Sequence, residues 1–111
     1  MAYDEQLAER VRVELEGVTG VTERKMFGGL AFMVNGNMAC GIVKDELTLR
    51  LGAEGAVAAL ERPHVREMDF TGRPLTGMVY VGQAGLAEAE LHSWVQQAVT
   101  FARSLPPKAR K

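Results

Sequence analysis

Two adjacent glycines close the segment Met26-Phe27-Gly28-Gly29, which is the first candidate for a binding site. Consecutive glycines can present backbone N–H groups to an anion. A phosphate-binding loop, however, has more glycines at set spacing, carries a lysine and leads into a helix, whereas this segment leads into a strand-like alternation. We therefore interpret all four residues as structural. Gly28 and Gly29 permit a bulge or a tight strand entry, and Met26 and Phe27 pack into the core.

The other reactive side chains are isolated from one another. Cys40 lies in an apolar stretch with no basic neighbour that would lower its pKa, so we interpret it as a small buried hydrophobic residue. His64 and His92 stand alone and, with one interior cysteine, make no zinc ligand set. No serine, histidine and aspartate occur in the pattern of an activated nucleophile. We expect no catalytic residue, no cofactor, no metal and no enzymatic activity.

Basic residues gather in two short segments of a chain whose net charge is −1, from 13 Lys plus Arg and 14 Asp plus Glu. Such a balance is not typical of a general nucleic-acid-binding domain. Arg24 and Lys25 form one basic segment, and Lys108, Arg110 and Lys111 belong to the other. These five residues are the contacts that a nucleic acid would use, weakly and with a steep loss of affinity in salt.

The length of 111 residues fits one domain, which we place at residues 1–105, followed by a basic flexible tail at 106–111. One cysteine excludes an intramolecular disulfide. The first residues lack the basic and apolar regions of a secretory signal, and no apolar run is long enough to span a bilayer. We therefore expect a cytoplasmic protein with no membrane partner.

The first half of the chain predicts a helix followed by a meander of three strands. Apolar residues at helical spacing, with Asp4 as N-cap, predict a helix at 4–16. From Phe27 the period becomes two, and Asn35-Gly36 predicts a tight hairpin turn. The return strand, 38–43, is expected to place Met38 with Cys40 and Ile42 on one face. A third strand follows at 47–51, and the meander is expected to have one dry face.

The second half predicts two helices and two strands. We expect a short alanine-rich helix at 53–61 that buries Val57 and Leu60, then strands at 65–70 and 78–81. The final strand is apolar on both faces, which places it under a helix and would leave an edge or face for a partner. A helix at 86–104 carries Trp94 on its core-facing stripe. The order α-β-β-β-α-β-β-α predicts an α+β fold, an antiparallel sheet with helices packed on one face.

Four segments carry a resemblance to a known family. They are RKMFGGLAFMVNGNMA at 24–39, ELTLRL at 46–51, RPLTGM at 73–78 and FARSLPPK at 101–108. Together they resemble the TfoX N-terminal domain family (TfoX/Sxy-like), in its single-domain form. The resemblance implies a fold similar to type III secretion chaperones and a link to regulators of competence for DNA uptake, which carry a second, C-terminal domain that we do not expect here.

Three functions remain open at this point. The resemblance and the lack of a site favour a non-enzymatic protein-interaction or regulatory module whose partner is another protein or a second copy of the chain. The alternatives are weak nucleic-acid binding through the basic tail with Arg24 and Lys25, and small-ligand binding at Gly28-Gly29 and the adjacent sheet face.

Overall fold

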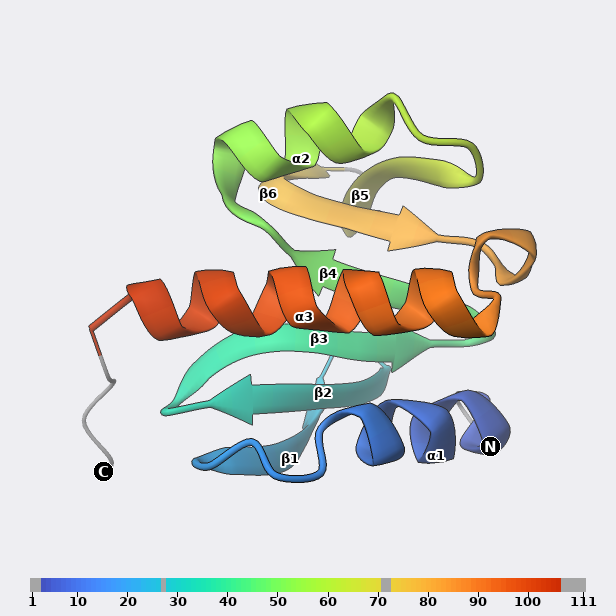
Figure 1. Ribbon diagram of the computed structural model, residues 1–111. Helices are drawn as coiled ribbons and strands as arrows, with labels where there is room; N and C mark the ends of the chain where they lie inside the picture. The colour runs from blue at the N-terminus through green and yellow to red at the C-terminus, as the bar shows by residue number, and fades with distance from the viewer. Residues whose placement is uncertain (1–2, 27, 71–72, 107–111) are drawn as a thin grey trace.

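The computed structural model describes residues 3–26, 28–70 and 73–106 of the chain. Within these residues, the helices are α1 (Glu5–Glu14), α2 (Gly52–Leu60) and α3 (Glu88–Ser104), with a short 3₁₀ turn at Gln83–Gly85. The strands are β1 (Val21–Met26), β2 (Gly29–Val34), β3 (Asn37–Val43), β4 (Glu46–Arg50), β5 (Val65–Phe70) and β6 (Arg73–Val81). They form one antiparallel sheet in the order β1-β2-β3-β4-β6-β5 (Figure 1).

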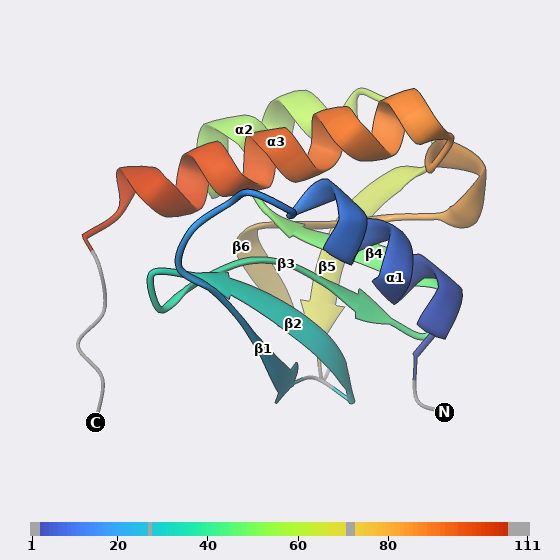
Figure 2. The same cartoon turned by 60° about the horizontal axis from the view of Figure 1, so that its bottom comes forward.

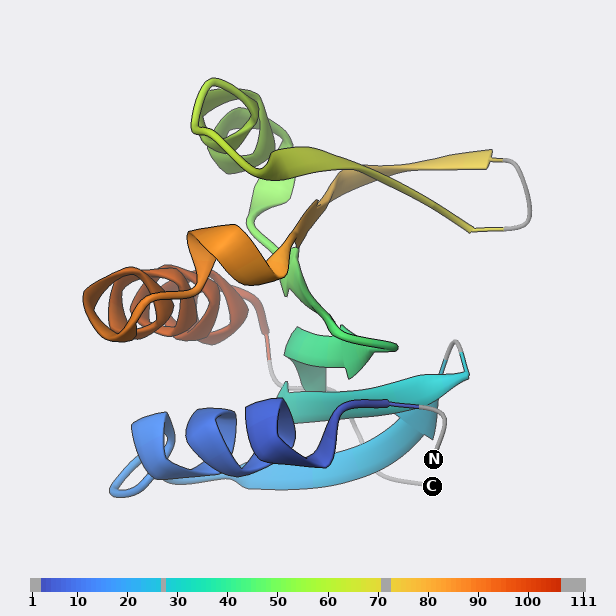
Figure 3. The same ribbon diagram turned by 90° about the vertical axis from the view of Figure 1, so that its right-hand side faces the viewer.

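All three helices lie on the same side of this sheet, as Figures 2 and 3 show. The main core fills the space between the two layers, because alternate strand residues meet the apolar stripes of the helices. Trp94, on α3, is almost fully buried there, as its position in the helical pattern predicts. The α+β class and the predicted order of elements are confirmed, with one further strand that the sequence pattern did not indicate.

That further strand is β1, which pairs with β2 along its whole length, from Val21 opposite Val34 to Met26 opposite Gly29. Its central residues, 22–25, are all exposed and mostly charged. An edge strand with such side chains lacks the alternation of a half-buried strand and discourages pairing with another chain. The ladder with β2 defines this element, so hydrophobic periodicity could not reveal it.

The predicted hairpin between β2 and β3 is confirmed at Asn35 and Gly36, whose φ angles are +53° and +82°. Both positive values are those of the tight turn that Asn-Gly favours. The predicted face of Met38 is wrong. A register shift between Phe32 and Met33 sends Met38 to the side of the sheet that has no helices, away from Cys40. The expectation of one dry face is therefore also wrong, because apolar residues are buried on both faces.

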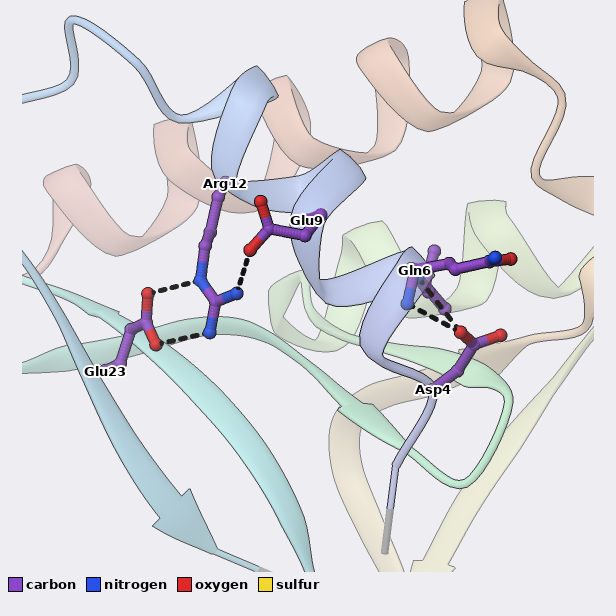
Figure 4. A network of polar contacts seen from close by, with 6 residues as sticks. Asp4, Gln6, Glu9, Arg12 and Glu23 are labelled. Atoms are coloured by element: carbon purple, nitrogen blue, oxygen red, sulfur yellow. Dashed lines mark hydrogen bonds and ion pairs between the residues drawn. The ribbon is translucent and has the colours of Figure 1, made fainter. Parts of the chain in front are cut away.

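Polar contacts hold α1 against the sheet edge (Figure 4). The Asp4 carboxylate caps the helix by accepting hydrogen bonds from the backbone N–H groups of Gln6, at 2.9 Å, and Leu7, at 3.2 Å. Arg12 donates from Nε to Glu23 Oε2 at 2.8 Å and from Nη2 to Glu23 Oε1 at 2.9 Å, and it also pairs with Glu9. The two-point contact with Glu23 ties α1 to β1.

A close approach of two glycines sets the position of α2. Gly52 follows β4 and turns the chain out of the sheet with φ +80°, while Gly77 in β6 has φ +84°. A Cβ atom at Gly77 would stand 3.1 Å from Gly52 Cα, and one at Gly52 would stand 2.5 Å from the ring of Phe101 on α3. The Leu51 N–H donates to the Gly77 carbonyl at 2.8 Å. Glycine is required at Gly52 both by its backbone angle and by the space available.

The predicted buried face of α2 is wrong. Ala56 and Ala59 are its buried residues, whereas Val57 is 65% exposed and Leu60 is 38% exposed. The small alanine side chains let the helix backbone lie close to β6, so the larger residues point outward. The final strand, β6, begins earlier than the pattern predicts and lies between β4 and β5, so it offers no free edge.

We expect Gly52→Ala to lower the free energy of unfolding by roughly 3 kcal/mol, since a strained backbone and an overpacked ring contact add together. Gly17 is the matched control because it has φ +85° with nothing within 4 Å of a Cβ atom. Gly17→Ala should lower the free energy by only about 1 kcal/mol. Urea denaturation measures both, and equal losses would contradict the role of the Phe101 contact.

A second prediction concerns Glu23, whose pKa is lowered from 4.5 by its hydrogen bonds to Arg12. A lowered folded-state pKa gives stability that is present above the unfolded pKa and is lost as pH falls through the folded pKa. Glu23→Gln should lower the unfolding free energy by roughly 0.5 kcal/mol at neutral pH, the scale of a partly exposed pair. The difference from wild type should vanish in acid. Glu16→Gln is the control, at an exposed residue that forms no ion pair with any described residue, and it should leave the unfolding free energy nearly unchanged.

Candidate interaction surface

Gly28 lies in the turn between β1 and β2, and Gly29 is the first residue of β2. Gly28 has φ +73°, and a Cβ atom at Gly29 would stand 2.0 Å from the Ile42 carbonyl oxygen of β3. Both glycines thus have a backbone reason for their identity. Met26 ends β1, and Phe27 lies outside the described residues. The structure tests neither the predicted packing of Met26 and Phe27 nor ligand binding at this turn.

The residues predicted to contact nucleic acid are only partly described. Arg24 and Lys25 are neighbours in the edge strand β1 and are exposed. Successive residues of a strand point to opposite faces, so these two cations do not form one patch. Lys108, Arg110 and Lys111 lie outside the described residues. Nucleic-acid contact by this set stays a prediction.

The isolated reactive side chains remain apart in the fold. Cys40 is fully buried in the main core, and burial raises the pKa of its thiol to about 12. His64 is exposed at the turn before β5. His92, on α3, is exposed and its Nδ1 lies 2.6 Å from Glu14 Oε1. No group of metal-ligating side chains is assembled anywhere in the described residues.

The face of the sheet without helices carries a second buried cluster: Ala31, Met33, Met38, Met78 and Tyr80. The Arg66 guanidinium lies over the Tyr80 ring at 4.4 Å from its centroid and pairs with Glu46. Thr48 is also buried here, and its Oγ1 has no hydrogen-bond partner among the described residues. All the cluster residues are less than a tenth exposed, so they offer little surface to a binding partner.

A hollow lies on the opposite side, between α2 and α3. It is an open groove of about 670 Å³. Leu51 and Gly55 form its α2 wall, and Phe101 with Gln96, Gln97 and Thr100 forms its α3 wall. The two helices run in opposite directions over the sheet and make little direct contact with each other (Figure 1). The groove is therefore a gap between two helices that are both anchored to the sheet below.

Two arginines that flank α2 in the chain each stand over an aromatic ring of α3. The Arg62 guanidinium lies 5.3 Å from the ring centroid of Trp94, and the Arg50 guanidinium lies 5.8 Å from that of Phe101. Both distances fall within the range of a cation–π contact. Of these four residues only Phe101 lines the groove, whose α3 wall otherwise holds hydroxyl and amide side chains together with His92.

The outer ridge of α2 faces away from the groove, because Val57 lies about 160° around the helix from Gly55, which lines the groove. Val57 and Leu60 are exposed on it, although α1 also exposes one large apolar residue, Val13 at 59%. Sequence reasoning missed both the groove and the ridge, because it assigned Val57 and Leu60 to the core. The acid-flanked pattern Glu54-x-x-Val57-x-x-x-Glu61 could have revealed the ridge, because its i, i+3, i+7 spacing places three residues on one exposed helix face, whereas no sequence motif indicates the groove.

We expect Cys40 to be unreactive in the folded protein, because the thiolate is the nucleophile and burial disfavours it. A disulfide reagent at pH about 8 should modify native Cys40 at least about 100-fold more slowly than the urea-unfolded chain. Ser93→Cys, at an exposed α3 position, should add one rapidly reacting thiol and controls for an active reagent. Rapid modification of the native wild-type protein would contradict the assigned burial.

Among the described residues, no helix is long and apolar enough to cross a membrane. The family model of the TfoX N-terminal domain matches residues 14–102, a range that runs from the end of α1 to near the end of α3. Neither the curated proteins nor the solved structures include a match to the chain. The expected similarity to type III secretion chaperones therefore stays a prediction. The match spans most of the chain, and the chain belongs to the TfoX N-terminal domain family.

Proposed function

We propose that this chain is a non-enzymatic protein-interaction module with a regulatory role related to competence, acting in the cytoplasm. The single observation that carries the proposal is the α2–α3 surface, which we define as the groove between these helices together with the exposed ridge residues Val57 and Leu60. Exposed apolar side chains and an open groove on the same helix layer favour contact with another protein. Membership of the TfoX N-terminal domain family supports the regulatory part of the proposal.

The chemistry of the groove favours binding over catalysis. Its wall contains hydroxyl and amide side chains, but Ser93 Oγ accepts a hydrogen bond from Gln97 Nε2 at 3.1 Å and donates none to a general base among the described residues. His92 precedes Ser93 by one position on α3, and it pairs with Glu14 on α1. Adjacent helix residues point in directions about 100° apart, so His92 does not face Ser93 as a nucleophile's base would.

Site-specific photo-crosslinking in the cells that produce the protein tests this function. A photoreactive amino acid in place of Val57 should give covalent adducts with a protein partner, because that side chain stands on the proposed contact surface. The same amino acid in place of Val13, equally apolar and exposed on α1, is the matched control and should give none. Adducts at both positions, or at neither, would contradict the assignment of this surface.

A further inference from the structure

We propose that the face of the sheet without helices holds a binding site for a small, uncharged aromatic molecule that carries one hydroxyl group. The site is the second buried cluster, and the hydroxyl of Thr48 at its centre binds the polar group of the ligand. It lies on the side of the sheet opposite the α2–α3 surface (Figure 3), so it does not depend on the protein-interaction function.

Thr48 is the residue that points to a ligand. Its side chain is 1% exposed, and Oγ1 has no hydrogen-bond partner among the described residues. A hydroxyl can donate one hydrogen bond and accept two, and burial without any of them costs free energy. Natural proteins keep few such groups, and those that remain need an explanation. A hydrogen bond to a bound molecule explains this one.

The strand register places Thr48 in the middle of the cluster. Its cross-strand neighbours are Tyr80 on β6 and Gly41 on β3, and Gly41 is in turn opposite Ala31 on β2. Residues directly opposite one another on adjacent strands share a face of the sheet. A Cβ atom at Gly41 would stand 3.0 Å from Thr48 Oγ1, and glycine places no side chain there. The hydroxyl therefore has an aromatic ring on one side and only backbone on the other.

Three methionines supply the apolar part of the site. Met33, Met38 and Met78 belong to this cluster, whereas the main core contains no methionine among the described residues. Methionine is unbranched, adapts to irregular shapes and makes favourable sulfur–aromatic contacts. The described helices all lie on the other side of the sheet, so these side chains can change rotamer without displacing a helix.

The charges beside the cluster favour an uncharged ligand. The Arg66 guanidinium lies over the Tyr80 ring, 4.4 Å from its centroid, and pairs with Glu46. Because each of these two charges already has an opposite charge beside it, the pair gives no preference for an anion or a cation.

The burial of the cluster favours a small molecule over a protein. All five of its residues are less than a tenth exposed, which leaves no flat apolar area for a protein interface. Small-ligand sites instead enclose most of the ligand surface, with few polar groups that fix its orientation. An aromatic ring among thioethers and beside Tyr80, with its hydroxyl on Thr48, matches this chemistry.

Methyl NMR on the purified full chain tests the site, with phenol as the probe. The chain has six methionines and one isoleucine, Ile42, whose methyl groups can be labelled with ¹³C. The signals of Met33, Met38 and Met78, assigned through Met→Leu variants, should shift and saturate with a dissociation constant of about 1 mM. Ile42 is fully buried in the main core, on the other side of the sheet, and its signal should not move.

Thr48→Val separates the hydroxyl from the rest of the site. Valine has nearly the same shape, and the variant should unfold at a temperature higher by about 3 °C because no hydroxyl is buried without a partner. Its affinity for phenol should fall at least about tenfold, since the hydrogen bond is lost. Its affinity for toluene, which has a methyl group in place of the phenol hydroxyl, should change less than about twofold. Thr100→Val, in the wall of the α2–α3 groove, is the matched control and should leave both affinities unchanged.

Three results would overturn the proposal. The first is the lack of a saturable shift in the three methionine signals, and the second is a set of shifts confined to the groove residues Gln96 and Gln97. The third is a Thr48→Val chain in which the affinities for phenol and toluene fall together or both stay unchanged. The photo-crosslinking test at Val57 concerns the opposite side of the sheet, so each function can fail while the other stands.

Discussion

The close approach of Gly52 to Gly77 is the constraint on which the positions of α2 and α3 over the sheet depend. It brings the start of α2 against β6, where a Cβ atom at Gly77 would stand 3.1 Å from Gly52 Cα, and it leaves room for the Phe101 ring beside Gly52. Positive φ at both glycines turns the chain at this point without strain. Both α2 and α3 are thereby fixed to the sheet near one end of the groove, and the space between them follows from that placement.

The distribution of side chains on α2 is a consequence of the same placement. A helix held close to a strand can bury only small residues on the near side, and these are Ala56 and Ala59. Val57 and Leu60 then have no space toward the sheet and point outward. Exposed apolar residues in this position do not reflect a poorly formed core, because the core below is closed by alanines and by Trp94 of α3.

Local signals in the sequence predict the parts of the fold that local interactions determine. The Asp4 cap and the Asn35-Gly36 turn are confirmed because each depends on residues a few positions apart. β1 could not be predicted, because its charged residues acquire strand geometry only from the ladder with β2. The outward face of α2 could not be predicted either. Apolar periodicity marks Val57 and Leu60 as core residues, and only the distance between α2 and β6 excludes them from it.

The candidate surface was invisible in the sequence for a related reason. No single motif encodes the groove, which exists because two helices 28 residues apart in the chain, from Leu60 to Glu88, are anchored separately to one sheet. The two arginine–aromatic contacts of α3 are likewise assembled in space, since Arg50 precedes α2 and Arg62 follows it, yet both lie over rings of α3. The ridge is the opposite case, because Glu54, Val57 and Glu61 share one helix face by spacing alone.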